Sequence, residues 1–295
     1  MGKTQADTIL EEAEKLWLSG EFQQARECCR RARLLYHENG DPPGEAAALT
    51  QLGDLEAETG HYVAAREAYA DARKLFAMDG DQRDQAGVLV RLGQLAHREG
   101  QMDEARQFFT SAREMYGSAA DHSGVAHVVK RLGHIERDQG RQDRALELYA
   151  EAAATYRRGN DTLGQANALK AMAIMHRQLG ALDRAHEEYE AALDLYRQAG
   201  DALGEAAAQH GLGHLMQMAG NRVDARAALD SARQTYAHAG HLRGEAEALL
   251  DLGRLLASED PDKARSQLRH AAALAHRVGA HRLVEDADKE LSRLG

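Results

Sequence analysis

Few side chains in this sequence have types and spacing suited to catalysis or metal binding, and the clearest pair is His210 and His214. Four residues apart on a helix, two imidazoles share one face and can chelate a transition-metal ion. The metalloprotease pattern also needs a Glu between them, and a zinc site needs a third ligand. Neither stands nearby in the sequence. We therefore predict no metal and no other cofactor, and assign both histidines to partner binding.

The other reactive residue types lack the context that chemistry requires. Cys28 and Cys29 are adjacent and alone, which makes neither a disulfide framework nor a four-ligand metal site. We expect one thiol to pack inward and the other to be partly exposed, in a reducing environment. No glycine cluster has phosphate-binding spacing, and no nucleophile elbow or Ser/His/Asp order stands out. The sequence therefore predicts a protein that is not an enzyme.

Composition sets the broad class of the chain. It has 295 residues, a formal net charge of −10 and 43% hydrophobic residues, enough for a substantial core. No apolar run approaches the roughly 20 residues of a membrane span, and the N-terminus lacks the apolar stretch of a signal peptide. We expect a cytoplasmic protein with no membrane partner. The excess of Arg over Lys and the abundance of Ala suggest a GC-rich bacterial genome.

The glycines reveal the elements that position these side chains. Of 27 glycines, 21 fall on four columns with a period of 40 residues, beginning at Gly20, Gly40, Gly44 and Gly53. Alanine columns begin at Ala25 and Ala32, and an aromatic column begins at Tyr36. Periods of this length indicate a stacked repeat architecture rather than two ordinary domains.

Within one period the apolar residues follow a helical rhythm of three and four. We predict a helix A over about 44–59, a tight turn, and a helix B over about 62–79. Gly80 can adopt the left-handed conformation that ends helix B, and Asp41 and its equivalents stand where the next helix needs an N-cap. Gly53 is expected to be small because two helix backbones approach closely there.

The whole chain divides into such units, so we predict a single domain over 1–295. The predicted repeats span about 4–39, 43–79, 83–119, 123–159, 163–199, 203–239 and 243–279. A capping helix follows at about 281–293, where Asp288 replaces a core leucine. A polar outer side suits the end of a repeat array.

These columns resemble the tetratricopeptide repeat (TPR). Its large–Leu–Gly pattern on helix A and its Ala–aromatic–Ala pattern on helix B match Leu49, Leu52 and Gly53, followed by Ala65, Tyr69 and Ala72. The 40-residue unit and its Gly-Asp-x-x-Gly-Glu linker are similar to those of Pins-type adaptors, rapsyn, kinesin light chains and bacterial TPR regulators. The resemblance implies an all-α fold, a right-handed superhelical solenoid of seven hairpins plus the capping helix. It also implies that helix A lines a concave groove for partners.

Two known modes of partner binding do not transfer. Pins-type adaptors use an Asn after Leu-Gly, and here that position reads Asp54, Gln94, His134 and Ile174 in successive repeats. The carboxylate clamp of chaperone-tail-binding members uses Lys and Asn, and Lys130 matches one of these, but His134 replaces the Asn. The partner must therefore be inferred from the groove itself.

The predicted groove is positively charged in its centre. Counting Ala46 as position one, positions two, five, six, nine, twelve and thirteen of helix A should face the groove. In the third to fifth repeats these hold seven cations and one anion, Asp138. A concave surface of one sign favours a partner of the opposite sign, so we predict an acidic peptide or protein segment. The predicted partner-binding residues are Arg91, His97, Arg98, Lys130, Arg131, His134, Arg137, Asn167, Lys170, Arg177, His210 and His214.

The function that follows is a non-catalytic adaptor or scaffold for protein–protein interaction. Two alternatives stay open: a self-assembling structural scaffold, and a peptide or small-molecule sensor of a bacterial regulatory system. Nucleic acid is not expected, because the groove has almost no aromatic side chains to stack bases and the overall charge is acidic. A homo-oligomer is possible in either case.

Overall fold

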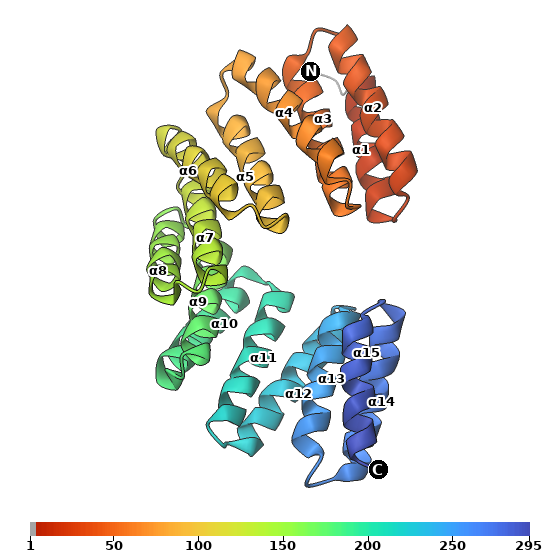
Figure 1. The fold of residues 1–295 in the computed structure, drawn as a ribbon, viewed down its shortest axis with the longest axis vertical. Coiled ribbons are helices and arrows are strands. Elements are labelled where there is room, and N and C mark those ends of the chain that lie inside the picture. Colours follow the sequence, from red (N-terminus) through yellow and green to blue (C-terminus); the bar gives the residue numbers. More distant parts are fainter. Residues whose placement is uncertain (1–3) are drawn as a thin grey trace. The chain divides into compact units, whose positions relative to one another are not determined.

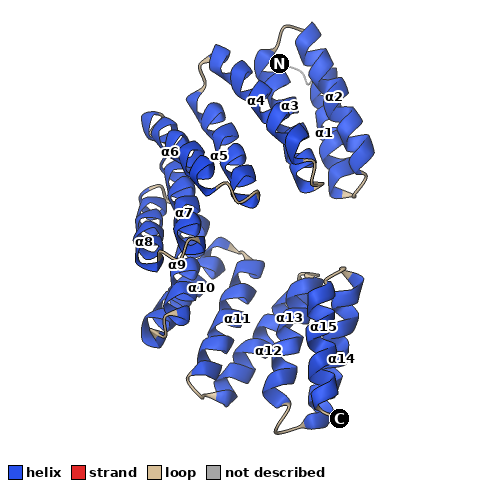
Figure 2. Ribbon diagram, in the orientation of Figure 1, coloured by secondary structure: helices blue, strands red, loops and turns tan. Residues whose placement is uncertain are grey.

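The computed structural model describes residues 4–295, and these form fifteen α-helices with no strand (Figures 1 and 2). The first helices of the hairpins are α1 (Gln5–Leu18), α3 (Pro42–Glu58), α5 (Gln82–Arg98), α7 (His122–Asp138), α9 (Thr162–Gln178), α11 (Ala202–Met218) and α13 (Leu242–Leu256). The second helices are α2 (Phe22–Glu38), α4 (Tyr62–Asp79), α6 (Met102–Ser118), α8 (Gln142–Arg158), α10 (Leu182–Ala199), α12 (Arg222–His238) and α14 (Pro261–Arg277). The last helix is α15 (His281–Arg293). The predicted all-α repeat fold is confirmed.

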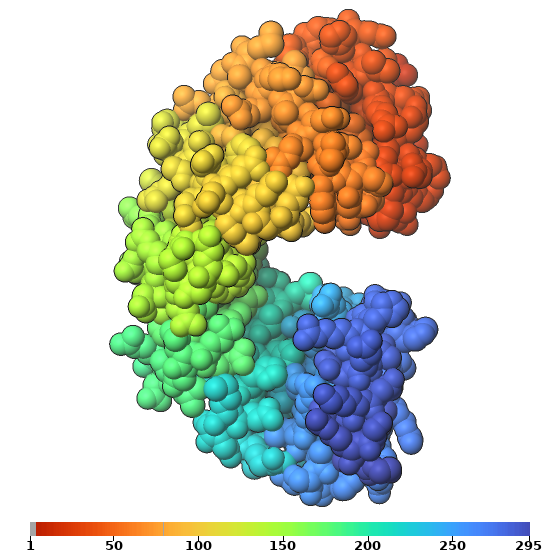
Figure 3. Space-filling model, in the orientation of Figure 1, coloured from red at the N-terminus to blue at the C-terminus, as the bar shows by residue number. Residues whose placement is uncertain are grey.

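The helices are grouped in two compact units, Met1–Leu148 and Tyr149–Gly295. In the first unit α1 to α7 each pack on their neighbours in the chain, and in the second unit α9 to α15 do the same. The colour bands of Figure 3 follow chain order within each unit for the same reason. No helix among residues 4–295 is both long and apolar enough to cross a membrane. A single domain over 1–295 stays a prediction.

The turns and caps follow the predicted chemistry. Gly60 and Gly80 have φ values of 81° and 80°, in the left-handed region that ends a helix. The N-cap carboxylate of Asp41 accepts a hydrogen bond from the backbone N–H of Gly44, and Asp201 repeats this contact with Gly204. The helix ends of each hairpin are therefore fixed by residues close to them in the sequence.

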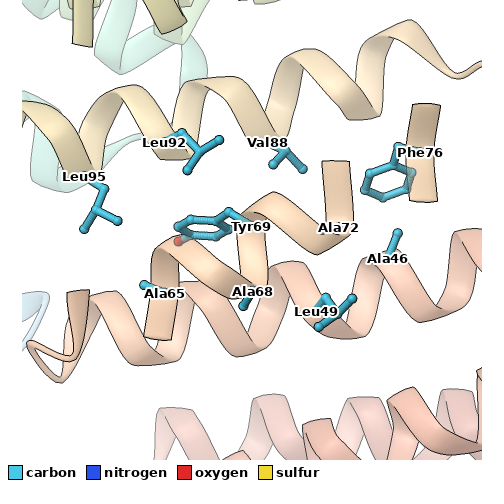
Figure 4. Packing of buried hydrophobic residues seen from close by; sticks show 10 residues of the cluster. All are labelled: Ala46, Leu49, Ala65, Ala68, Tyr69, Ala72, Phe76, Val88, Leu92 and Leu95. Atoms are coloured by element: carbon cyan, nitrogen blue, oxygen red, sulfur yellow. The ribbon is translucent and has the colours of Figure 1, made fainter. Parts of the chain in front are cut away.

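The glycine of helix A is small for a reason that differs from the prediction. A Cβ on Gly53 would lie 2.5 Å from the ring of Tyr69, whereas the prediction invoked close helix backbones. Tyr69 is buried, and Figure 4 shows its ring beside Leu92 and Leu95 of α5, in the core where α3, α4 and α5 meet. The space left by the missing side chain is thus filled by an aromatic ring of helix B.

A repeated ion pair joins successive repeats in the first unit. Arg26 on α2 donates to Glu56 on α3 over 3.0 Å, and both side chains are only 7% exposed. Arg106 makes the equivalent contact with Glu136 over 2.9 Å. Arg66 instead pairs with Glu99, three residues further along the repeat, over 2.6 Å. Breaking the buried Arg26–Glu56 pair would leave one charge unpaired inside the protein, whereas the other two arginines are about a third exposed and contribute less.

The two cysteines are both buried, which corrects the expectation that one thiol would be partly exposed. They lie in the core formed by α1, α2 and α3 with Ala6 and Tyr36. Burial raises the pKa of the Cys29 thiol to about 12, so this sulfur stays protonated and unreactive.

Candidate partner-binding site

A hollow of the first unit lies over α1, α3 and α5. It has a volume of about 650 Å³, and a neighbouring hollow of about 270 Å³ continues it. The two share Trp17, Asp54 and Arg91, and we call them together the Trp17 hollow. Its lining residues are Glu14, Trp17, Leu18, Pro43, Ala47, Thr50, Gln51, Asp54, Ala57, Glu58, Tyr69, Phe76, Asp84, Gly87, Val88, Arg91, Gln94, Leu95 and Arg98. Apolar, acidic and basic groups thus meet in one concavity.

Sequence reasoning missed the aromatic group of this hollow. Trp17 is the only tryptophan, and its Nε1 donates to Glu58 Oε2 over 2.7 Å, from α1 to α3. It lies 40 residues before Ala57, a position already assigned to the groove. Extending the groove columns into the first repeat would therefore have found it.

A carboxylate at the centre of the hollow neutralises a predicted binding cation. Asp54 Oδ1 accepts a hydrogen bond from Arg91 Nε over 2.8 Å and from the Tyr69 hydroxyl over 2.7 Å. Burial, and the Asp54 charge beside it, raise the pKa of Tyr69 above its ordinary value. Arg91 is therefore held rigidly against Asp54, and its charge is partly compensated before any partner arrives.

The neighbouring helix pair has a similar ionic contact. His97 Nε2 on α5 lies 2.9 Å from Asp138 Oδ2 on α7. Arg137 Nη2 lies 2.8 Å from Asp138 Oδ1. Asp138, the one anion of the residue count, thus contacts two of the predicted binding residues.

The cations of α7 surround His134. Burial, and next the charges of Arg137, Arg131 and Lys130, lower the pKa of His134 to about 3. The imidazole is therefore neutral at physiological pH. Arg131 Nε also donates to His127 Nε2 over 3.3 Å. Burial is the main cause of the shift, and the three cations of α7 add to it against the opposing charge of Asp138.

Arg98 differs from the other predicted cations. It lies at the end of α5, on the rim of the Trp17 hollow, and it is exposed. Among residues 4–295 it makes no hydrogen bond or ion pair. A carboxylate arriving at the hollow can pair with this guanidinium without displacing an internal partner.

In the second unit, Tyr196 contacts two of the predicted binding residues of α9. Asn167 donates its amide N–H to the Leu163 carbonyl over 3.0 Å and accepts from the Tyr196 hydroxyl over 2.9 Å. Lys170 Nζ lies 5.4 Å from the centre of the Tyr196 ring, and burial lowers its pKa. Asn167 was predicted to supply hydrogen bonds to a partner, and here its amide already serves the fold.

Arg177 carries an unusual buried atom. Its Nε is shielded from solvent and has no hydrogen-bond partner among the described residues. A buried donor without a partner costs free energy, so this atom lowers the stability of the fold.

The two histidines of α11 meet a third polar group from the next repeat. His210 Nε2 lies 2.8 Å from Asp251 Oδ2 on α13, and His214 Nε2 lies 3.1 Å from the same oxygen. The prediction of no metal relied on the lack of a nearby third ligand. That reason is wrong, because Asp251 is distant in sequence and close in space.

Comparisons with known proteins agree with this architecture. Residues 5–77, 84–158 and 130–198 match the family model described as Tetratricopeptide repeat, which confirms the resemblance read from the columns. Comparison with curated proteins finds no match.

Three solved structures illustrate the shared fold. Aspartyl phosphate phosphatase F from Bacillus subtilis has a TM-score of 0.71 at 12% identity, over 91% of this chain and 70% of its own. The Rap conjugation gene regulator of plasmid pLS20, in complex with the Phr* peptide, has a TM-score of 0.63 at 14% identity, over 95% of this chain and 76% of its own. BtubC from P. vanneervenii has a TM-score of 0.62 at 22% identity, over 80% of this chain and 93% of its own. At these identities the likeness concerns the fold alone.

Proposed function

Because the chain belongs to the tetratricopeptide repeat family, we propose that it is a non-catalytic interaction module that binds an acidic peptide or protein segment. The proposed binding surface of the first unit is the Trp17 hollow together with the basic face of α7. The observation that carries the proposal is the hollow itself. There a tryptophan and an exposed, unpaired Arg98 line one concavity of about 650 and 270 Å³.

The mixed lining indicates what the partner must offer. Trp17, Leu18 and Pro43 provide an apolar surface for a side chain, while Arg98 provides a bidentate group for a carboxylate. Lys130, Arg131 and Arg137 on α7 extend the positive potential beyond the hollow. An acidic segment with an apolar residue matches both features. The Phr* peptide bound to the pLS20 Rap regulator shows that a protein of similar fold binds a peptide.

The second unit contributes to this proposal through its own cations. Lys170 and Arg177 of α9 were assigned to the groove, and we propose them as binding cations of the second unit. We further propose that the chain acts in the cytoplasm of a bacterium.

The single tryptophan provides a direct test. An acidic peptide of Glu, Gly and Leu residues is titrated into the protein while the emission of Trp17 is followed, and a peptide with Lys in place of Glu serves as the control. Binding in the hollow should change the emission, should weaken with salt because the contact is ionic, and should fail with the Lys peptide.

Charge reversal locates the contact. Arg98→Glu should weaken binding of the acidic peptide by roughly 5- to 10-fold, since the change of two charge units acts at several ångströms in a water-like dielectric. Arg73→Glu makes the same charge change at an exposed residue of α4 outside the hollow and should have little effect. Equal effects of both variants, or no change in Trp17 emission, would contradict the proposal. Growth in light scattering without peptide would instead favour the self-assembling scaffold.

A further inference from the structure

His210, His214 and Asp251 form a compact polar cluster between two successive helices A of the second unit. The imidazole rings lie on one face of α11, with centres 4.8 Å apart and planes tilted by 32°. Asp251 reaches them from α13, and the three ligand atoms all lie within 4.8 Å of one another. The acidic peptide proposal uses none of this geometry.

The carboxylate is already oriented by its neighbours. Its Oδ2 faces His210 Nε2 and His214 Nε2. Arg254 Nη1 lies 3.3 Å from the other carboxylate oxygen, Oδ1, which orients Oδ2 toward the histidines. Such outer contacts are typical of metal sites, where a neighbouring group fixes the ligand.

Access to the cluster is partial. The side chains of His210 and Asp251 are 14% and 12% exposed, while that of His214 is 33% exposed. The two inner groups are thus held by packing, and the outer histidine leaves a side open to solvent. A bound ion could keep water in its remaining coordination positions through that opening.

From this geometry we propose that His210, His214 and Asp251 bind a divalent transition-metal ion of the zinc type and so link α11 to α13. Two imidazole nitrogens and one carboxylate oxygen are the donors that such ions prefer. Metal–ligand bonds of about 2.0–2.1 Å in a tetrahedral site place ligand atoms roughly 3.4 Å apart. The contacts of 2.8 and 3.1 Å from Asp251 are slightly shorter than this, so the donors must move apart by a few tenths of an ångström. Each imidazole must also carry its proton on Nδ1, so that the lone pair of Nε2 is free for the ion.

The test uses the full chain without a histidine tag, stripped of metal with a chelator and titrated with ZnCl2 by calorimetry. We expect one ion per chain. Asp251→Asn keeps the side-chain shape but removes the anionic ligand, and it should weaken binding roughly 10- to 100-fold or more. His214→Ala, at the exposed edge of the cluster, should weaken it similarly. His186→Ala removes an exposed histidine of the same unit and should leave binding unchanged.

A second measurement keeps the proposal testable if a variant is unstable. Co²⁺ added to the metal-free wild type should give visible absorption bands of nitrogen and oxygen ligation, and added Zn²⁺ should displace them. Zinc binding that is absent in the wild type, or that is equal in wild type, Asp251→Asn and His214→Ala, would overturn the site. Failure of the acidic peptide to bind would leave this result unaffected.

Discussion

Substitutions of Asp54 can separate an effect on stability from an effect on partner binding, because one of its oxygens contacts both a core residue and a predicted binding residue. Its Oδ1 accepts from Tyr69, a buried residue of the repeat core, and from Arg91, a predicted binding residue. Asp54→Asn keeps an oxygen in place for the tyrosine but removes the negative charge that opposes Arg91. The substitution therefore changes the electrostatics of the Trp17 hollow with little change in shape.

The effect on stability should be small. The Arg91 and Asp54 side chains are 38% and 25% exposed, and an ion pair so open to solvent contributes about 0.5–1 kcal/mol. Asp54→Ala also leaves the buried Tyr69 hydroxyl without its acceptor, which adds about 1–3 kcal/mol. We therefore expect a loss of under about 1 kcal/mol in the free energy of unfolding for Asp54→Asn, and about 1.5–4 for Asp54→Ala.

The effect on binding should have the opposite sign. A carboxylate bound roughly 6 Å from Asp54, in an effective dielectric between those of a protein surface and water, is repelled by about 1 kcal/mol. Removing that repulsion should tighten binding of the acidic peptide by about fivefold, since 1.4 kcal/mol corresponds to a factor of ten. The gain should shrink at high salt, where the Debye length falls to about 3 Å in 1 M salt.

Urea unfolding and Trp17 titrations measure the two effects on the same protein samples. A less stable protein that binds the acidic peptide more tightly supports the assignment of the hollow. Unchanged or weaker binding by a folded Asp54→Asn protein refutes it, because the charge of Asp54 would then be irrelevant to the partner.

Two further predictions concern stability. Gly53→Ala should lower the free energy of unfolding by about 1–2 kcal/mol, because the new methyl group overpacks the Tyr69 ring. Its control, Gly117→Ala, meets no atom within 4 Å and should raise that free energy by up to about 1 kcal/mol; urea titrations that rank the two the other way would contradict the packing argument. His134, with its pKa lowered to about 3, stays neutral in the fold while the unfolded chain binds a proton below pH 6.5. Acidification from pH 7 to 5 should therefore cost wild type about 1–2 kcal/mol more than His134→Gln, and parallel pH profiles would refute this.

The sequence alone determined the repeat, because each hairpin is defined by residues close to it in the chain. The 40-residue columns place the left-handed turn at Gly60 and the N-cap at Asp41, and both are local contacts. The family resemblance followed from the same columns. The columns also predict which face of helix A turns toward the groove, and most of the lining of the Trp17 hollow stands at those positions, although Tyr69 and Phe76 come from helix B.

Only the tertiary structure decided which charges are available. Asp54 compensates Arg91 across 37 residues, and Asp251 joins His210 across 41, distances at which residue types alone do not reveal a partner. Each such contact depends on the packing of one helix A on the next and on the rotamers of both side chains. The 40-residue period brings equivalent positions of successive repeats together. The side-chain geometry between neighbouring repeats then determines which of these residues form ion pairs with each other and which stay available to a partner.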